Sequence, residues 1–468
     1  MRLIRATLPR LALPVALSTL IAAPALGDAE RLERDLRAFF ADEGELTIGE
    51  VSDALLRSRV TAEALRFDAA EGDRLLIDRY RVSGDYERPE EVTLEGVRLE
   101  DGLTELLLLG IDRLVLGEPG WAVPPGDDEG LAAMRLGSLA AEGLVIEHGA
   151  ELAEGVGAED ALGEGRLAVG RLRGETLSRE AIGRLELHEL SGTGLPLEEM
   201  GEGDFTLDRL LLEDLEGLDR EDEQRLGRLE LEALEILVEG SRLLALEALG
   251  LDGDLGDGEA GLRLEALDLE LTRLIELSPE EERTQMRMAS NVLTDGSGQL
   301  RLDAVVDARW EEQDDETGRL LSESQLSFRD ALRLDLDVEG LLALPEGMTH
   351  ADLVDGERLL EQASLNGGLL ILKLSDQGLF GRLATLGAAM EGVSEAQYLE
   401  QARTQAQGFG MMFGPQVEAL LAGLVSLMEG SASELEVTLD LPAEKNLQRF
   451  ADDPLALPDR LAMQVETR

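Results

Sequence analysis

The chain of 468 residues has no cysteine and few aromatic residues, with two Trp, three Tyr and nine Phe. The absence of cysteine excludes a disulfide scaffold, a zinc ribbon, a thiol enzyme and an iron–sulfur protein, because each requires sulfur. Lysine occurs only as Lys373 and Lys445, and the 43 basic residues face 98 acidic ones, so the net charge is −55. Nucleic acid is bound by basic surfaces and stacked on aromatic rings, so this composition argues against a nucleic-acid partner.

The acidic residues are spread along the whole chain and form no single block. Dense carboxylates keep a protein hydrated at high salt, where the Debye length falls to about 3 Å at 1 M and self-repulsion is screened. A second interpretation is a reservoir for cations or for a basic partner. The even distribution favours adaptation to high salt.

The first 27 residues have the pattern of a secretory signal peptide. Arg2, Arg5 and Arg10 precede an apolar stretch at 11–26, and Ala25-Leu26-Gly27 is a small-x-small cleavage site. An uncleaved anchor is the alternative, but an apolar run with two prolines is at the lower limit for spanning a bilayer. We therefore expect a periplasmic protein without a transmembrane segment after cleavage, with secretion as the alternative.

The remaining chain is rich in leucine, which accounts for 97 residues. A helix is expected at 28–41, where apolar residues recur at helical spacing. From 46 to about 277, short leucine-rich runs alternate with charged residues and are broken by glycine every ten to twenty residues. Short alternating runs bounded by turn residues predict an antiparallel β-meander.

A loose repeat, L-x-L/V-x-x-L, occurs six times within 167–267. The first two apolar residues of each unit share one face of a strand, and the following step of three is typical of a β-bulge or a bend. Spacings of three and four also fit a helix, so both structures stay open. Strand is favoured because glycine keeps the runs short. The units begin at Leu167, Leu185, Leu210, Leu229, Leu244 and Leu262.

The second half predicts a mixture of helices and strands. Ser278-Pro279-Glu280-Glu281 has the pattern of a capping box and predicts a helix over 278–292. Strands are expected near 300–310, 320–328, 332–338, 369–374 and 435–441, and helices at 378–390, 394–406, 415–428 and 443–451. The predicted fold is α+β and predominantly antiparallel β, with helices at the N-terminus, near 278–292 and in the C-terminal quarter. We expect three regions, which are a signal peptide at 1–27, a repetitive β region at 28–277 and an α+β region at 278–468.

The best candidate for a metal site is an acidic loop with four carboxylates within eight residues. Calcium prefers six to eight oxygen ligands, so the loop is a candidate for a weak Ca²⁺ site. Counted from the first aspartate, Gly256 and Arg263 occupy positions where an EF-hand needs an acidic or amide ligand, so a pair of Asp-Gly turns is the favoured interpretation. No other cofactor is expected. The candidate ligands are Asp252, Asp254, Asp257 and Glu259.

The best candidate for an apolar binding site is the segment 408–415, which we interpret as a flexible, glycine-rich loop carrying large apolar side chains, followed by an apolar helix. Methionine and phenylalanine can repack around varied apolar ligands. The favoured interpretation, however, is a buried helix and its connector in the core. The candidate residues are Phe409, Met411, Met412, Phe413, Leu420 and Leu424.

The signal segment and the six leucine units resemble the exported, β-rich bacterial proteins of the AsmA-like and YdgA-like kind. The units cover less than a quarter of the chain. The resemblance implies a long sheet whose apolar face holds lipid or contacts an envelope partner, and it implies no catalytic residue.

The sequence leaves three functions open. The first is a non-enzymatic exported protein that binds a lipid or an envelope protein through one face of an extended sheet. The second is a hydrolase that works through paired carboxylates, with or without a divalent cation. The third is a structural protein adapted to high salt. The oligomeric state is not indicated by the sequence.

Overall fold

The computed structural model describes residues 27–41, 43–54, 58–70, 72–125, 130, 133–147, 165–196, 201–220, 224–254, 258–313, 317–345, 362–444 and 457–468. Strands account for 58% of these residues and helices for 22%, which confirms the predicted α+β class dominated by antiparallel strands. The contacts divide the chain into two compact units, Met1–Ser241 and Arg242–Arg468. The boundary lies before the predicted one at 277. The signal segment, except Gly27, lies outside the described residues.

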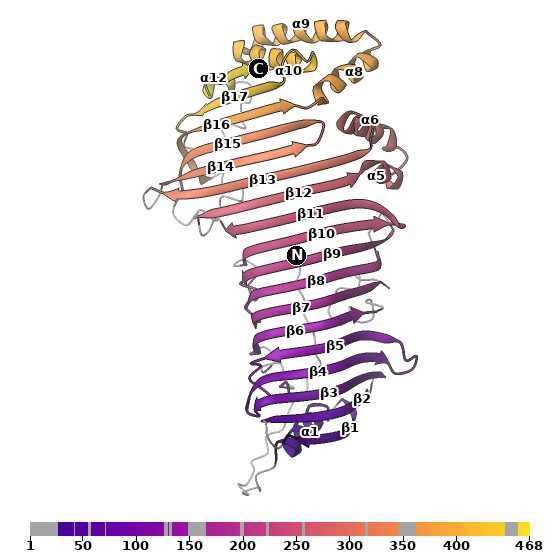
Figure 1. Ribbon diagram of the computed structural model, residues 1–468. Helices are drawn as coiled ribbons and strands as arrows, with labels where there is room; N and C mark the ends of the chain where they lie inside the picture. The colour runs from indigo at the N-terminus through magenta and orange to yellow at the C-terminus, as the bar shows by residue number, and fades with distance from the viewer. Residues whose placement is uncertain are drawn as a thin grey trace. The chain divides into compact units, whose positions relative to one another are not determined.

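The first unit is a β-meander in which each strand pairs antiparallel with the next one along the chain (Figure 1). The predicted N-terminal helix is confirmed as α1, Asp28–Phe39. The strands are β1 Gly44–Asp53, β2 Arg59–Ala69, β3 Asp73–Asp85, β4 Arg88–Asp101, β5 Leu107–Gly117, β6 Arg135–Ile146, β7 Arg166–Ser178, β8 Ala181–Pro196, β9 Glu202–Glu216 and β10 Arg225–Val238.

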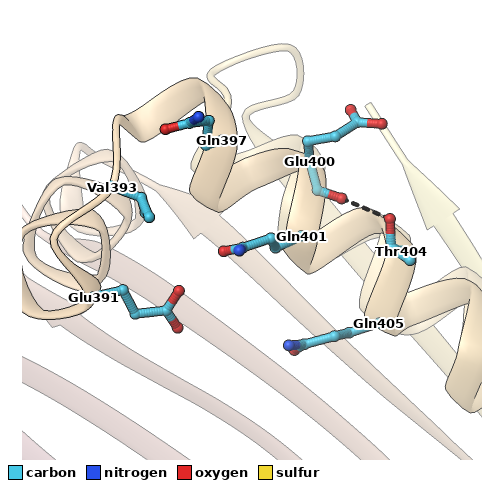
Figure 2. A pocket seen from close by; sticks show the side chains of 7 residues that line it. All are labelled: Glu391, Val393, Gln397, Glu400, Gln401, Thr404 and Gln405. Carbon is cyan, nitrogen blue, oxygen red and sulfur yellow. Dashed lines mark hydrogen bonds between the residues drawn. The ribbon is translucent and has the colours of Figure 1, made fainter.

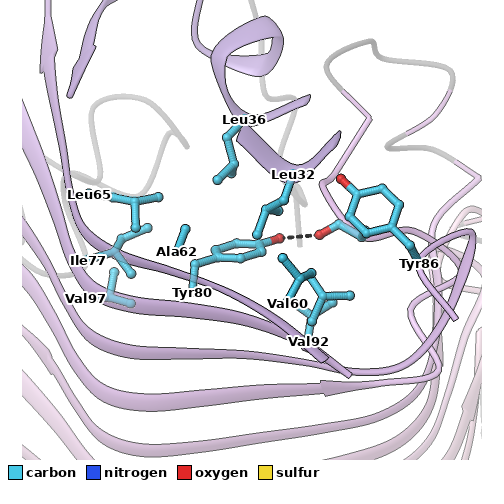
Figure 3. Packing of buried hydrophobic residues seen from close by; sticks show 12 residues of the cluster. Leu32, Leu36, Val60, Ala62, Leu65, Ile77, Tyr80, Tyr86, Val92 and Val97 are labelled. Carbon is cyan, nitrogen blue, oxygen red and sulfur yellow. Dashed lines mark hydrogen bonds between the residues drawn. The ribbon is translucent and has the colours of Figure 1, made fainter. Parts of the chain in front are cut away.

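Helix α1 covers the apolar face of the sheet at its β1 end. Leu32 and Leu36 are buried there among residues of β2, β3 and β4, and Figure 3 shows these strands curving around the cluster. The Tyr80 hydroxyl donates a hydrogen bond to the Ala122 carbonyl at 2.6 Å, and burial raises the pKa of this phenol above its usual range. The apolar face therefore lies on the inside of the curve.

The strands of the first unit contain non-glycine residues in the left-handed conformation, which is rare for L-amino acids. Glu189 in β8 has φ 55°, Asp214 in β9 has φ 53° and Ala233 in β10 has φ 54°. Each comes directly before the last leucine of an L-x-L-x-x-L unit. A left-handed residue interrupts the alternation of side chains, so two leucines three positions apart can face the same side. The repeat is therefore a strand with a bend, as one of the two sequence interpretations predicts.

These residues form two lines that cross the sheet, which we call the fold lines. In β9 the first line passes through Asp208, which stands opposite the left-handed Ala233 of β10, and the second passes through the left-handed Asp214. The two lines are thus six positions apart in β9. The left-handed residues of the first line lie on even-numbered strands. Those of the second line lie on odd-numbered strands, except that Glu118 follows directly after β5. The first line contains Ala64, Gly96, Gly143, Glu189 and Ala233, and the second contains Gly84, Glu118, Thr176 and Asp214.

The second unit also contains an antiparallel meander, from β11 to β18. Its strands are β11 Ser241–Asp254, β12 Glu259–Glu270, β13 Gln299–Glu312, β14 Thr317–Phe328, β15 Leu332–Ala343, β16 Ser364–Asp376, β17 Glu434–Leu441 and β18 Gln464–Thr467. Its helices are α5 Leu271–Leu277, α6 Arg283–Thr294, α8 Leu379–Glu391, α9 Glu395–Phe413, α10 Pro415–Met428 and α12 Leu457–Arg460.

Helices cover the apolar side of β15–β17. Val292 of α6, Phe380 of α8 and Leu427 of α10 are buried in one cluster with Leu435 and Val437 of β17. Figure 1 shows α8, α9 and α10 gathered beside β16 and β17. The C-terminal core is thus closed by helices.

Two local predictions are wrong. Ser278 does not open a helix: it ends α5, where its hydroxyl donates to the Leu274 carbonyl at 2.8 Å, and α6 begins at Arg283. The segment 408–413 is not a loop, because α9 continues to Phe413. Its Gly410 is buried where a Cβ atom would lie 2.5 Å from Glu418 of α10, so close helix packing outweighs the weak helix propensity of glycine.

Candidate functional site

The candidate site is the apolar face of strands β6–β10 in the first unit. Cross-strand partners form rows that run from strand to strand. One row can be followed through all ten strands of the unit, and every residue in it is apolar. It consists of Val51, Ala62, Tyr80, Leu94, Leu114, Ala141, Leu172, Leu187, Leu210 and Leu231.

Five such rows cross β6–β10, and together they define what we call the leucine face. Of these 25 positions, 23 are apolar and two are glycine. The positions are Leu136, Leu139, Ala141, Leu144 and Ile146 on β6; Leu167, Val169, Leu172, Gly174 and Leu177 on β7; Ile182, Leu185, Leu187, Leu190 and Gly192 on β8; Phe205, Leu207, Leu210, Leu212 and Leu215 on β9; and Leu226, Leu229, Leu231, Leu234 and Ile236 on β10.

Coverage distinguishes the leucine face from the same rows at the other end of the unit. Under α1, Ala62 is 0% exposed, Tyr80 is 4% exposed and Val82 is 1% exposed. On β6–β10, Leu136, Ala141, Val169 and Leu207 are also buried, but most positions are half-buried, including Leu172, Leu187, Leu210 and Leu231. Within the described part of the chain, no helix packs closely on β6–β10, whose close contacts are with neighbouring strands. Among the described residues, these rows on β6–β10 therefore have no helix packed closely on them.

The opposite face of the same strands carries a network of ion pairs. Arg209 contacts Glu186 at 2.8 Å, Glu230 at 3.2 Å and Glu232 at 2.7 Å. The hydrogen bond from Arg209 is the largest cause that lowers the pKa of Glu186 below its ordinary value. The acidic residues of this region thus form the charged side of an alternating strand pattern.

Glycine allows the strands to approach each other at the fold lines. Gly170 stands opposite Glu189, where a Cβ atom would lie 2.4 Å from the glutamate carboxylate and 3.0 Å from its Cβ. Gly227 stands opposite Asp214, whose Cβ would be 2.9 Å away. The glycines that break the leucine runs in the sequence therefore include positions inside strands, where the sheet bends between rows of the leucine face.

The six residues of the predicted apolar site at 409–424 lie in two different environments. Phe409 is 46% exposed, Met411 85% and Met412 73%, and Phe413 stacks on Phe409 with ring centroids 5.9 Å apart. Leu420 and Leu424 instead pack against the buried cluster of the second unit. These six residues do not form one surface.

The predicted metal ligands lie at the β11–β12 hairpin. Asp254 pairs with Glu259 across the two strands, and Glu259 forms an ion pair with Arg309 at 2.9 Å. Asp252 is opposite Gly261, and Asp257 lies outside the described residues. No group of three metal-ligating side chains occurs in the part of the chain that the structure describes.

The described residues include no helix that is long and apolar enough to cross a bilayer. Comparison of the sequence with models of known protein families finds no match, and no curated protein is significantly similar to the chain.

The sequence contains the leucine face, but reasoning from the repeat finds only part of it. The six units include residues of β7–β10 and miss β6 altogether. The signal is a longer pattern, L-x-x-L-x-L-x-x-L, in which each step of three spans a fold line. It occurs at Leu207-Leu210-Leu212-Leu215 and at Leu226-Leu229-Leu231-Leu234, and with isoleucine or alanine substitutions in β8 and β6.

Proposed function

We propose that the protein is an exported, non-enzymatic protein that binds the hydrocarbon chain of a lipid on the leucine face. The observation that carries the proposal is the set of five apolar rows on β6–β10, which no described helix covers closely. A large apolar surface on a protein usually marks a binding site. The resemblance to AsmA-like and YdgA-like proteins supports the same function, and the N-terminal signal pattern supports export to the periplasm.

The chemistry of the face suits an acyl chain. Its 25 positions contain no hydroxyl, amide or charged side chain, and Phe205 is the single aromatic residue among them. Such a surface offers contact area without directed hydrogen bonds. Neighbouring strands are about 4.8 Å apart, so a row across five strands spans about 19 Å. One leaflet of a bilayer core is about 15 Å thick, so an extended acyl chain fits along a row.

Lipid extraction from the purified protein and displacement of a fluorescent fatty acid test the proposal. We expect co-purified lipid, and we expect the double variant Leu187→Asn/Leu210→Asn to lose at least about tenfold in fatty-acid affinity, since both side chains lie in one row of the face. The matched control is Leu103→Asn/Leu106→Asn, which changes two leucines that are 91% and 51% exposed outside the rows.

Circular dichroism and the melting temperature show whether each variant is folded. Equal fatty-acid affinity of both double variants and the unchanged protein would contradict binding on the leucine face. The alternatives of a carboxylate hydrolase and of a structural protein adapted to high salt have no specific observation in their favour among the described residues.

A further inference from the structure

A second surface lies in the other unit, on the helices α8 and α9. An open cleft of about 540 Å³ is lined by Glu391 and Val393 on one side and by a face of α9 on the other. Figure 2 shows Gln401 and Gln405 pointing from α9 toward Glu391. The remaining lining residues are Gln397, Glu400 and Thr404. The cleft is therefore polar and carries carboxylates, unlike the leucine face.

Exposed methionines continue this cleft toward the C-terminal end of α9. Residues three and four positions apart lie on the same face of a helix. Met411 and Met412 therefore lie on the same face of α9 as Thr404, Gln405 and Gly408. Their exposed fractions are 85% and 73%, and Met390, beside Glu391 at the end of α8, is 73% exposed. We call Met411 and Met412 the methionine rim, whereas Met390 lies near the opposite, N-terminal end of α9.

Packing explains why Met411 and Met412 face solvent. Ala406 is 4% exposed and Gly410 is buried, and a Cβ atom on Gly410 would collide with Glu418 of α10. This side of α9 thus packs against α10, and the opposite side of α9 faces solvent. The stretch 404–417 has no charged residue, although 30% of the chain is charged.

The charges around the cleft indicate a basic partner. Glu391 forms no ion pair with any described residue, while Glu400 and Glu429 share Arg403, at 3.1 and 2.5 Å. The local surface is therefore negative beside an apolar rim. A flat bilayer would not fill a cleft and would force Glu391 to lose its water, which costs free energy.

We propose that the cleft and the methionine rim bind a basic amphipathic helix of a partner protein. Methionine side chains adapt to the apolar face of such a helix, and the carboxylates attract its lysine and arginine residues. The distance along α9 from Gln397 to Met412 is about 22 Å at 1.5 Å per residue, which matches four turns of a partner helix. This site is separate from the leucine face and does not depend on lipid binding.

Fluorescence anisotropy with a labelled 16-residue peptide of leucine and lysine in helical periodicity tests the proposal on the full chain. We expect Met411→Ser/Met412→Ser to weaken binding about tenfold and Glu391→Gln/Glu400→Gln about fivefold. The matched controls are Met288→Ser, a methionine 39% exposed on α6, and Glu280→Gln/Glu281→Gln, two exposed acids. Both controls should bind the peptide within about twofold of the unchanged protein.

Three results would overturn the proposal. If all variants bind the peptide equally, the attraction comes from the overall charge of −55. If Leu187→Asn/Leu210→Asn weakens peptide binding, the peptide occupies the leucine face. If the methionine variant loses binding to neutral phosphatidylcholine vesicles but keeps the peptide, the rim is a membrane contact. Unchanged melting temperatures ensure that lost binding is not lost folding.

Discussion

The two units build antiparallel meanders from similar leucine-rich strands but cover them differently. In the second unit, α6, α8 and α10 cover the apolar side of β15–β17, and Leu427 is 1% exposed there. In the first unit, α1 covers only the β1 end, and the leucine face on β6–β10 is half-buried at most of its positions. The same residue type is therefore fully buried where helices cover it and mostly half-buried where no described helix does.

The strands also differ in backbone conformation. Left-handed residues recur through β2–β10 of the first unit. In the second unit β12 contains one, Ala266 with φ 51°, and β13–β17 contain no left-handed non-glycine residue among those described. A non-glycine residue in this conformation costs about 1–2 kcal/mol. These residues align from strand to strand, so the conformational cost recurs along the first unit. The aligned bends curve its sheet, and the apolar rows lie on the inside of the curve.

The largest expected difference between the units concerns leucine truncation. Leu427→Ala removes a fully buried side chain, so we expect it to lower the free energy of unfolding of the second unit by about 3 kcal/mol. Leu210→Ala removes a half-buried one and should cost about 1 kcal/mol. Urea unfolding of the two variants measures both values, and equal losses would show that the leucine face is covered as fully as the C-terminal core.

Alanine-to-glycine substitutions should have opposite signs on a fold line of the first unit and in the regular strand β13 of the second unit. Ala233 has φ 54° on a fold line, so Ala233→Gly removes left-handed strain and should stabilise the protein by about 1 kcal/mol. Ala304 on β13 is not among the residues with positive φ, so Ala304→Gly should destabilise it by about 0.5–1 kcal/mol. Urea unfolding gives both signs. A loss of stability at position 233 would contradict the strained fold line.

Sequence reasoning predicts the fold class because alternation and glycine spacing are local signals. It places α10 at Pro415–Met428 correctly, since proline marks the first turn and glutamate and glycine follow the last one. It misses the end of α9 because the packing of Gly410 against Glu418 is a tertiary contact. It predicts an apolar sheet face but cannot tell which leucine rows helices cover, because this cover depends on contacts between segments distant in sequence.

Truncation of a charged side chain on the first unit should cost about as much stability as truncation on the leucine face, and less than truncation in the C-terminal core. Arg209→Gln removes a guanidinium, 24% exposed, that bridges three glutamates, and we expect a loss of about 1 kcal/mol at low salt. Arg98→Gln removes a single exposed contact with Asp78 at 3.2 Å and serves as the control. Thermal unfolding at about 0.05 and 1 M NaCl checks the result, because screening should reduce the difference between the two variants. A loss that is independent of salt would mean that Arg209 acts through packing.

The smallest predicted effect is a pH dependence at the covered end of the first unit. Hydrogen bonds from Arg66 at 2.7 Å and Arg74 at 3.0 Å lower the pKa of Asp68 to about 2. A carboxyl group with a lowered pKa stabilises the folded state above its unfolded value of about 3.9, and this contribution disappears as the pH falls toward 2. Because Asp68 is 42% exposed, solvent screening limits the effect to about 0.3 kcal/mol.

Urea unfolding between pH 2 and pH 6 should show Asp68→Asn less stable than the unchanged protein at pH 6 and equal to it near pH 2. The control Asp73→Asn removes a nearby exposed acid that forms no ion pair with a described residue. A difference for Asp68→Asn that persists at pH 2 would show that the carboxylate charge is not the cause.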